Sequence, residues 1–141
     1  MTERLAEITA GKKPTGVYRW RSRAHPASVR RELTAAGWTV HVIDGRAVAD
    51  KTSLLDACAG ALRLPSRSGR NWDAFADCVA DLSWLLGDGH VLLWEAYGTL
   101  AAADPDTWRI AYGIFDSSVL HVLLRGTGPT LAPDGTPIPI L

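Results

Sequence analysis

Apolar and polar residues follow two patterns that alternate along the chain. The pattern predicts three strands, over residues 38–44, 90–94 and 119–124, and the near-continuous apolar run of 90–94 and the apolar run of 119–124 indicate buried strands. Apolar residues at helical spacing predict three helices: one that begins at Asp50 or Thr52 and ends near residue 62, one over 72–86 and one over 108–117. Strands separated by helices favour parallel pairing with right-handed crossovers, so the pattern predicts an α/β fold.

The first 36 residues add a strand and a helix to this series. Residues 1–13 are polar and predict a loose segment. Apolar and basic residues alternate over 16–21, which indicates a half-exposed strand. Pro26 then favours the first turn of a helix, and Gly37 favours its end. This strand–helix unit could add a fourth strand to the sheet.

The last residues are rich in proline and glycine. A Pro-Asp-Gly-Thr turn signal and two further prolines predict a surface segment that folds back as an edge hairpin. At 141 residues the chain is long enough for one domain with its own core. We therefore expect a basic N-terminal extension (1–36) packed on the same domain, an α/β domain (37–126) and a C-terminal tail (127–141).

The formal net charge of zero conceals two oppositely charged parts. Residues 1–36 carry eight basic and three acidic residues, a net +5, and the remainder carries seven basic and twelve acidic residues, a net −5. Between Asn71 and Trp108 there are seven acidic residues and no lysine or arginine. A surface of one sign attracts partners of the other sign, although an acidic run can also be a solvated face.

Residues 71–81 place acidic side chains at a spacing that folding does not require. Asn71 can cap a helix. That helix would place Asp73, Asp77 and Asp81 on successive turns, with no basic residue between them. Carboxylates at this spacing repel each other by roughly 0.2–0.5 kcal/mol per pair. We therefore predict a negative surface that binds a positively charged partner.

The same segment resembles the barstar family of intracellular ribonuclease inhibitors. The resemblance rests on the motif LPxxxGxNWDAFADC over residues 64–78, and it extends more loosely from about 38 to 126. It implies a barstar-like fold with a small parallel sheet of about three strands and helices on both faces, to which the N-terminal strand–helix unit is an extension. It also implies a non-enzymatic protein that caps the cationic active site of a cognate ribonuclease and protects its own cell.

Four residues of the motif match contact positions of the family. Asp77 matches the central acid that enters the nuclease site, and Asp73 matches its flanking acid. Asn71 and Gly69 match the loop that lies against the enzyme. Three of them also have a structural explanation: Asn71 as a helix cap, Gly69 as a turn residue, and Asp73 as a charge that the helix dipole favours.

The chain departs from the family pattern beside these residues. Arg67 and Ser68 occupy loop positions where the family type has aromatic residues, and Ala76 replaces an aromatic residue before the central acid. We expect Arg67, Ala76 and Asp81 to belong to the partner-binding surface, and differences of this kind determine which partner is accepted. Near the later helix, Asp116 is the closest match to a further family acid.

Other chemistry has little support in the sequence. The four histidines have no metal-binding or catalytic spacing, and no phosphate-binding loop or nucleophile motif is present. Asp73, Asp77 and Asp81 span two helical turns, whereas a hard cation needs several oxygens that converge on one point. We therefore predict no enzyme activity, no metal site and no cofactor.

The expected location follows from the cysteines and the hydropathy pattern. Cys58 and Cys78 predict buried free thiols in a reducing compartment. The N-terminus lacks the apolar region of a signal peptide, and no run is long enough to span a membrane. We expect a cytoplasmic protein that binds a basic microbial ribonuclease, of the barnase-like or toxin type, in a one-to-one complex without membrane contact.

Two alternatives remain open at this point. The acidic surface could bind another basic protein. The basic N-terminal extension could instead bind nucleic acid, because Trp20 in the basic strand could be exposed and stack on bases. This second alternative is the less favoured one. The other tryptophans at apolar positions are predicted to lie in the core: Trp72, Trp84, Trp94 and Trp108.

Overall fold

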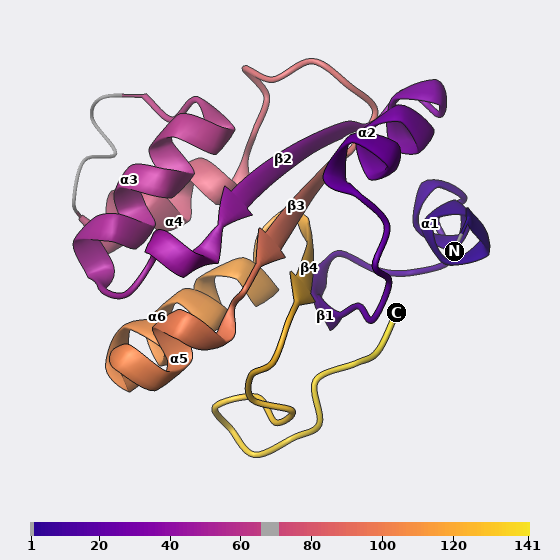
Figure 1. The fold of residues 1–141 in the computed structure, drawn as a ribbon. Coiled ribbons are helices and arrows are strands. Elements are labelled where there is room, and N and C mark those ends of the chain that lie inside the picture. Colours follow the sequence, from indigo (N-terminus) through magenta and orange to yellow (C-terminus); the bar gives the residue numbers. More distant parts are fainter. Residues whose placement is uncertain (1, 66–70) are drawn as a thin grey trace.

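A four-stranded parallel sheet forms the centre of the molecule (Figure 1). The computed structural model describes residues 2–65 and 71–141. The strands, which lie in the order β1-β4-β3-β2, are β1 (Gly16–Arg19), β2 (Thr39–Asp44), β3 (His90–Glu95) and β4 (His121–Arg125). The α/β class is confirmed. The sheet has four strands rather than about three because the N-terminal strand β1 pairs with β4.

Helices cover both faces of the sheet, as predicted (Figure 1). One face carries α1 (Thr2–Thr9) and α2 (Pro26–Ala35). The other face carries α3 (Lys51–Leu62), α4 (Trp72–Ala80), α5 (Gly98–Ala103) and α6 (Pro105–Asp116), and a 3-10 turn, η1 (Gly45–Ala47), follows β2. Strand β3 explains the near-continuous apolar run, because Val91 packs toward α1 and α2 while Leu92 packs toward α3–α6.

Side-chain caps fix where two of the helices begin. Before α3, Asp50 accepts a hydrogen bond from the Ser53 amide at 2.8 Å, and Ser53 Oγ accepts one from the Asp50 amide at 3.1 Å. Before α6, Asp104 accepts from the amide and the hydroxyl of Thr107, at 3.2 and 2.7 Å. With Pro105 in the first turn, α6 begins earlier than the predicted residue 108.

The N-terminal residues form more secondary structure than their polar composition predicts. Helix α1 forms where a loose segment was expected, because Leu5 and Ile8 are buried in the core beside α2. Strand β1 is covered on both faces, with Val17 in one core and Tyr18 in the other. The prediction of a half-exposed strand is therefore wrong.

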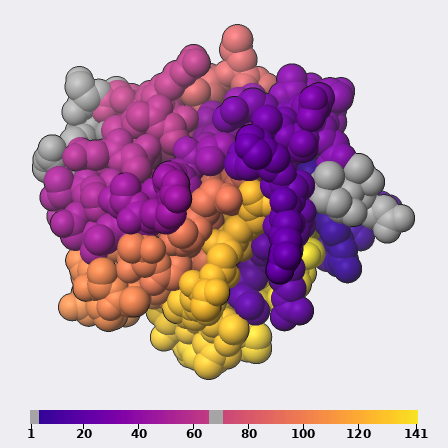
Figure 2. All heavy atoms as spheres, viewed as in Figure 1, coloured from indigo at the N-terminus to yellow at the C-terminus, as the bar shows by residue number. Residues whose placement is uncertain are grey.

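The C-terminal tail folds back beside β1, and Figure 2 shows it (yellow) next to the N-terminal segment (indigo). The Arg19 amide donates to the Pro139 carbonyl at 2.8 Å, and the Leu141 amide donates to the Arg19 carbonyl at 2.9 Å. A local turn over 131–137 closes with an antiparallel bridge. Unlike a pure surface segment, the tail also buries three side chains, those of Ala132, Ile138 and Leu141.

Helix α4 is shorter than the sequence pattern predicts, because it ends at Ala80 and not near residue 86. The Val79 carbonyl accepts a hydrogen bond from the Val119 amide at 3.1 Å, so a group that would otherwise be free at the helix end is satisfied by another segment. Beyond the helix, Trp84 is 38% exposed and Leu86 is 91% exposed. The prediction that the helix continues to residue 86 and the prediction that Trp84 lies in the core are therefore wrong.

Cys58 and Cys78 are buried free thiols, as predicted. None of the helices in the described part of the chain is long and apolar enough to cross a membrane. Within residues 2–65 and 71–141, no group of three or more histidine, cysteine, aspartate or glutamate side chains is placed to hold a metal ion.

Candidate functional site: the acidic surface of α4

Helix α4 is anchored to the core through its apolar side. Phe75 and Val79 are fully buried. The Phe75 ring contacts the Phe115 ring edge-to-face, with centroids 5.7 Å apart, and the Trp72 ring with centroids 6.2 Å apart. Because these contacts hold one side of the helix, its solvent-facing side is presented in a defined position.

Asn71 caps α4, as the sequence predicts. Its Oδ1 accepts hydrogen bonds from the amides of Asp73 and Ala74, at 2.7 and 3.3 Å. Two amides of the first turn, which have no partner inside the helix, are satisfied in this way. The Asn71 side chain is also exposed, so capping leaves it accessible to a partner.

Asp73 and Asp77 are exposed and lie one turn apart on α4. Asp73 lies in the first turn, where the helix dipole favours a negative charge. Asp77 lies farther along the helix and does not have this local stabilisation. The position of Asp77 therefore has no explanation in the local stability of α4.

Asp81 does not continue this row, which corrects the prediction of three acids on successive helical turns. Its backbone is extended, with φ −150° and ψ 104°, and it forms the C-terminal cap of α4. Its Oδ1 accepts a hydrogen bond from the Ser83 amide at 3.0 Å. The third carboxylate thus belongs to the turn that ends the helix.

Asp77 and Asp81 nevertheless border the same hollow, which has a volume of about 330 Å³. Helix α4 and the segment after it form the walls, which are lined by Ala74, Asp77, Cys78, Asp81, Ser83 and Trp84. Two carboxylates and an indole around one opening suit a positively charged planar group such as guanidinium, which pairs with carboxylates and stacks on aromatic rings.

The acids of this surface are not neutralised by the chain's described residues. Within residues 2–65 and 71–141, the ion pairs join Lys13 to Glu7, Arg46 to Asp44 and Arg125 to Glu95, and none involves an acid of α4 or its C-terminal cap. Among the described residues, the Lys51 ammonium lies near the start of α4, 5.3 Å from the centroid of the Trp72 ring.

The other predicted site residues have different surroundings. Arg67 and Gly69 lie outside the described residues. Ala76 is half-buried on α4. Asp116, the match to a further family acid, accepts a hydrogen bond from the Val17 amide at 3.2 Å, so it helps to hold β1 at the sheet.

Trp84 is the residue of this surface that sequence reasoning missed. Its indole Nε1–H donates to the Leu62 carbonyl at 3.3 Å, which holds the ring between α3 and the end of α4. An apolar residue at helical spacing was interpreted as core. The Gly87-Asp88-Gly89 sequence favours a helix end, but it lies too far along the chain to show that the helix stops before Trp84.

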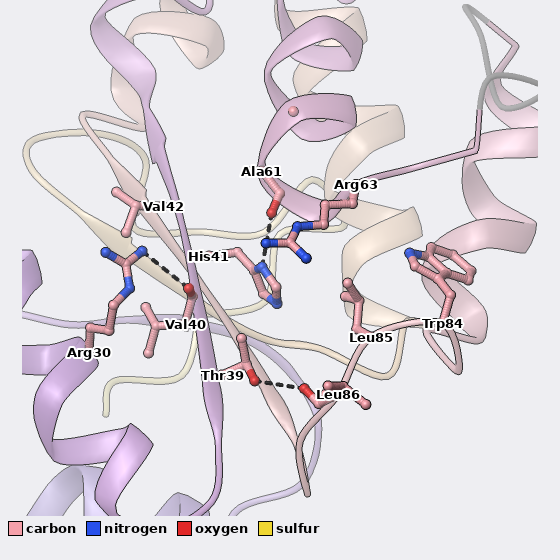
Figure 3. A pocket seen from close by; sticks show the side chains of 11 residues that line it. Arg30, Thr39, Val40, His41, Val42, Ala61, Arg63, Trp84, Leu85 and Leu86 are labelled. Atoms are coloured by element: carbon pink, nitrogen blue, oxygen red, sulfur yellow. Dashed lines mark hydrogen bonds between the residues drawn. The ribbon is translucent and has the colours of Figure 1, made fainter.

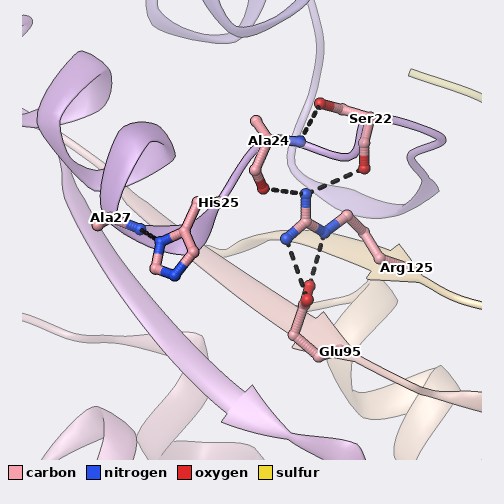
Figure 4. A network of polar contacts seen from close by, with 6 residues as sticks. All are labelled: Ser22, Ala24, His25, Ala27, Glu95 and Arg125. Carbon is pink, nitrogen blue, oxygen red and sulfur yellow. Dashed lines mark hydrogen bonds and ion pairs between the residues drawn. The ribbon is translucent and has the colours of Figure 1, made fainter.

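The basic N-terminal segment does not present an exposed tryptophan, contrary to one of the alternatives. Trp20 is 4% exposed, and its ring centroid lies 5.4 Å from the Arg125 guanidinium. Figure 4 shows that Arg125 also binds the carbonyls of Ser22 and Ala24 and the carboxylate of Glu95. The indole of Trp20 is therefore not available to stack on a base.

The sequence model of the barstar family, described as barnase inhibitor, matches residues 38–132, about two thirds of the chain. The chain belongs to the barstar family. No curated protein matches the chain.

The barstar match begins at β2 and includes β3, β4 and all of α3–α6. It includes the motif and the acidic surface. Helix α1, strand β1 and helix α2 lie outside it, so the fourth strand comes from residues that the barstar family model does not cover. The family's members act as inhibitors of ribonucleases and not as enzymes.

Proposed function

We propose that this chain is a non-enzymatic inhibitor that caps the cationic active site of a basic microbial ribonuclease of the barnase-like or toxin type. One observation carries the proposal: Asp73 and Asp77 are exposed one turn apart on a helix whose other side is fixed in the core. The chain's membership of the barstar family supports the same function.

The chemistry of the target explains why such a surface inhibits. A ribonuclease stabilises negative charge on phosphate with arginine, lysine and histidine side chains. Carboxylates on α4 can occupy the phosphate positions, and a carboxylate can form a bidentate pair with an arginine side chain. A helix already anchored at Phe75 lowers the ordering cost of binding. Inhibition then requires no chemical step by the inhibitor.

In this proposal Asp77 is the central contact and Asp73 flanks it. Asn71 and Gly69 form the loop that lies against the enzyme. Three further residues determine which nuclease is accepted, by the charge and size that they place beside the central contact: Arg67, Ala76 and Asp81. The complex is one-to-one and forms in the cytoplasm, where the inhibitor protects its own cell.

The test is titration of the chain against a panel of small basic microbial ribonucleases of the guanyl-specific type, with RNA cleavage as the readout. We expect stoichiometric loss of cleavage with the cognate enzyme. Asp77→Ala should weaken inhibition by roughly two orders of magnitude or more, because it leaves a desolvated cation unpaired. Asp88→Ala, a change of an exposed acid outside α4, is the matched control and should have little effect.

Two results would count against the proposal. Equal effects of Asp77→Ala and Asp88→Ala would remove Asp77 from the contact. Absence of inhibition across the whole panel would indicate that the acidic surface binds a basic protein of another class.

A further inference from the structure

The two edges of the sheet differ in whether another segment pairs with them. At β1 the C-terminal tail pairs with the strand through Arg19 and Ile140. At the opposite edge, β2 pairs with β3, and no strand from residues 2–65 or 71–141 lies on its other side. An uncovered strand presents amide and carbonyl groups with which a further strand can pair.

The hydrogen bonds show which groups of β2 face outward. The Thr39 amide donates to the Gly89 carbonyl at 3.0 Å, on the side of β3. Backbone groups alternate along a parallel strand, so those of Val40 and Val42 point away from β3. The Arg30 guanidinium agrees with this direction, because its Nη2 donates to the Val40 carbonyl at 3.3 Å.

A hollow of about 680 Å³ lies along this edge (Figure 3). Its walls come from α2, the last turn of α3 and the segment after α4. Its lining includes Arg30, Val40, Val42, Arg63, Trp84 and Leu86. Figure 3 shows Arg30 on one side of β2 and Arg63 on the other, with β2 between them.

The hollow is positively charged. Arg30 and Arg63 are exposed, and none of the residues that line the hollow is acidic. Neither arginine takes part in an ion pair with another residue of the described chain. The charge is therefore opposite to that of the α4 surface and complements an acidic ligand.

The hollow also has an apolar end. Five large hydrophobic side chains among the described residues are exposed, and two of them, Trp84 and Leu86, line this hollow. Leu86 is 91% exposed, so nothing in the described chain covers it. A ligand for the whole hollow therefore combines backbone pairing, acidic groups and apolar side chains.

Charge and geometry disfavour three other occupants: a second copy, the C-terminal tail and helix α1. Pairing of β2 with β2 of a second copy would bring two sets of Arg30 and Arg63 together, which is unfavourable. The C-terminal Leu141 is buried beside β1 at the far edge of the sheet. The N-terminal helix α1 packs on the face of α2 and does not reach the hollow.

We propose that the β2 edge binds an extended segment of another protein that carries acidic and apolar side chains and adds to the sheet as a fifth strand. Strand addition takes its affinity from main-chain hydrogen bonds and its specificity from alternate side chains. Acids at neighbouring positions of the segment, whose side chains point to opposite faces of the sheet, pair with Arg30 and Arg63, and an apolar residue contacts Leu86. This surface shares Trp84 with the hollow beside α4 but contains none of the α4 acids, and the proposal does not depend on nuclease inhibition.

The first experiment selects random twelve-residue peptides displayed on phage against the full chain. Arg30→Gln/Arg63→Gln serves for counter-selection, and Arg109→Gln, a change of an exposed arginine on α6, is the matched control. We expect peptides that carry aspartate or glutamate at neighbouring positions, so that acids face both sides of the added strand, together with apolar residues. They should bind the double variant roughly tenfold more weakly and the Arg109→Gln and Asp77→Ala variants unchanged.

The second experiment locates the peptide. Amide chemical shifts should change at Val40 and Val42, and N-methylation of alternate peptide amides should abolish binding. The proposal is overturned if no acidic peptides are enriched, if they bind the double variant equally well, or if the shifts map elsewhere. Self-association that is lost in the double variant, measured by sedimentation, would instead identify a second copy as the occupant and would also overturn it.

Discussion

Arg125 and Glu95 form a two-pronged ion pair across β4 and β3, with Nε–Oε1 at 2.6 Å and Nη2–Oε2 at 3.0 Å. Arg125 is 7% exposed, and its Nη1 donates to the Ser22 and Ala24 carbonyls at 3.0 and 2.7 Å. One buried arginine thus connects the barstar-like part of the sheet to the segment that follows β1. The N-terminal addition is joined to the core by specific polar contacts as well as by apolar packing.

We therefore expect Glu95→Gln to destabilise the fold. The change removes the negative charge that compensates a buried guanidinium, and the free energy of unfolding should fall by about 2 kcal/mol. Urea denaturation at neutral pH measures this. Asp44→Asn breaks the exposed pair with Arg46 and is the control, which should leave the unfolding midpoint unchanged. Equal midpoints for Glu95→Gln and the wild type would contradict a structural role for the pair.

Asn71 allows the capping role to be separated from a contact role. Asn71→Ala should lower the free energy of unfolding by about 1 kcal/mol, because two amides of α4 lose their acceptor. Asn71→Asp retains an acceptor at this position and should stay close to the wild type in stability. Urea denaturation of both variants provides the measurement. If Asn71→Ala were as stable as the wild type, the cap would not contribute to stability.

Three buried histidines predict a loss of stability in mild acid. Burial lowers the pKa of His41 to about 4, although its bond to the Ala61 carbonyl opposes this shift. Burial also lowers the pKa values of His90 and His121. In the unfolded chain each imidazole titrates near 6.5. The unfolded state therefore binds more protons below that pH, so stability is complete above it and falls toward pH 4.

The corresponding measurement is urea denaturation at intervals between pH 8 and pH 4.5. His41 alone should contribute a loss of up to about 3 kcal/mol across its full window. His41→Gln should show a shallower pH dependence than the wild type, because the variant lacks this titration. Carboxyls with a lowered pKa, such as Asp50, change stability only at lower pH. Parallel curves for the two proteins would show that His41 does not carry the effect.

The sequence pattern predicted most of the fold, because in those elements the local preference for helix or strand agrees with the packing in the folded protein. The run of β3 is apolar on both faces, as a strand inside a parallel sheet must be. The caps Asn71 and Asp50 lie where the spacing places them. The α/β class followed from these elements, and the family match confirms the resemblance that the motif of residues 64–78 carries.

The wrong predictions lie where a distant segment decides the outcome. Leu5 and Ile8 give too weak a local signal to predict α1, which forms because α2 provides an apolar surface. Helix α4 ends before Asp81 because the Val119 amide supplies the Val79 carbonyl with a partner. Trp20 is buried because Arg125 and the α1–α2 core cover it. None of these contacts is visible in a local stretch of sequence.

The last prediction concerns the rate at which the proposed complex forms. Asp73, Asp77 and Asp81 form a negative surface without internal ion pairs among the described residues, and a ribonuclease active site is positive. Attraction between such surfaces speeds association and is screened within about 8 Å at physiological salt. We therefore expect the association rate to fall at least tenfold between low and high salt, with a much smaller change in dissociation. Stopped-flow fluorescence measures both rates, and Asp77→Asn should flatten the salt dependence of association. A salt-independent association rate would show that the acidic surface does not steer the encounter.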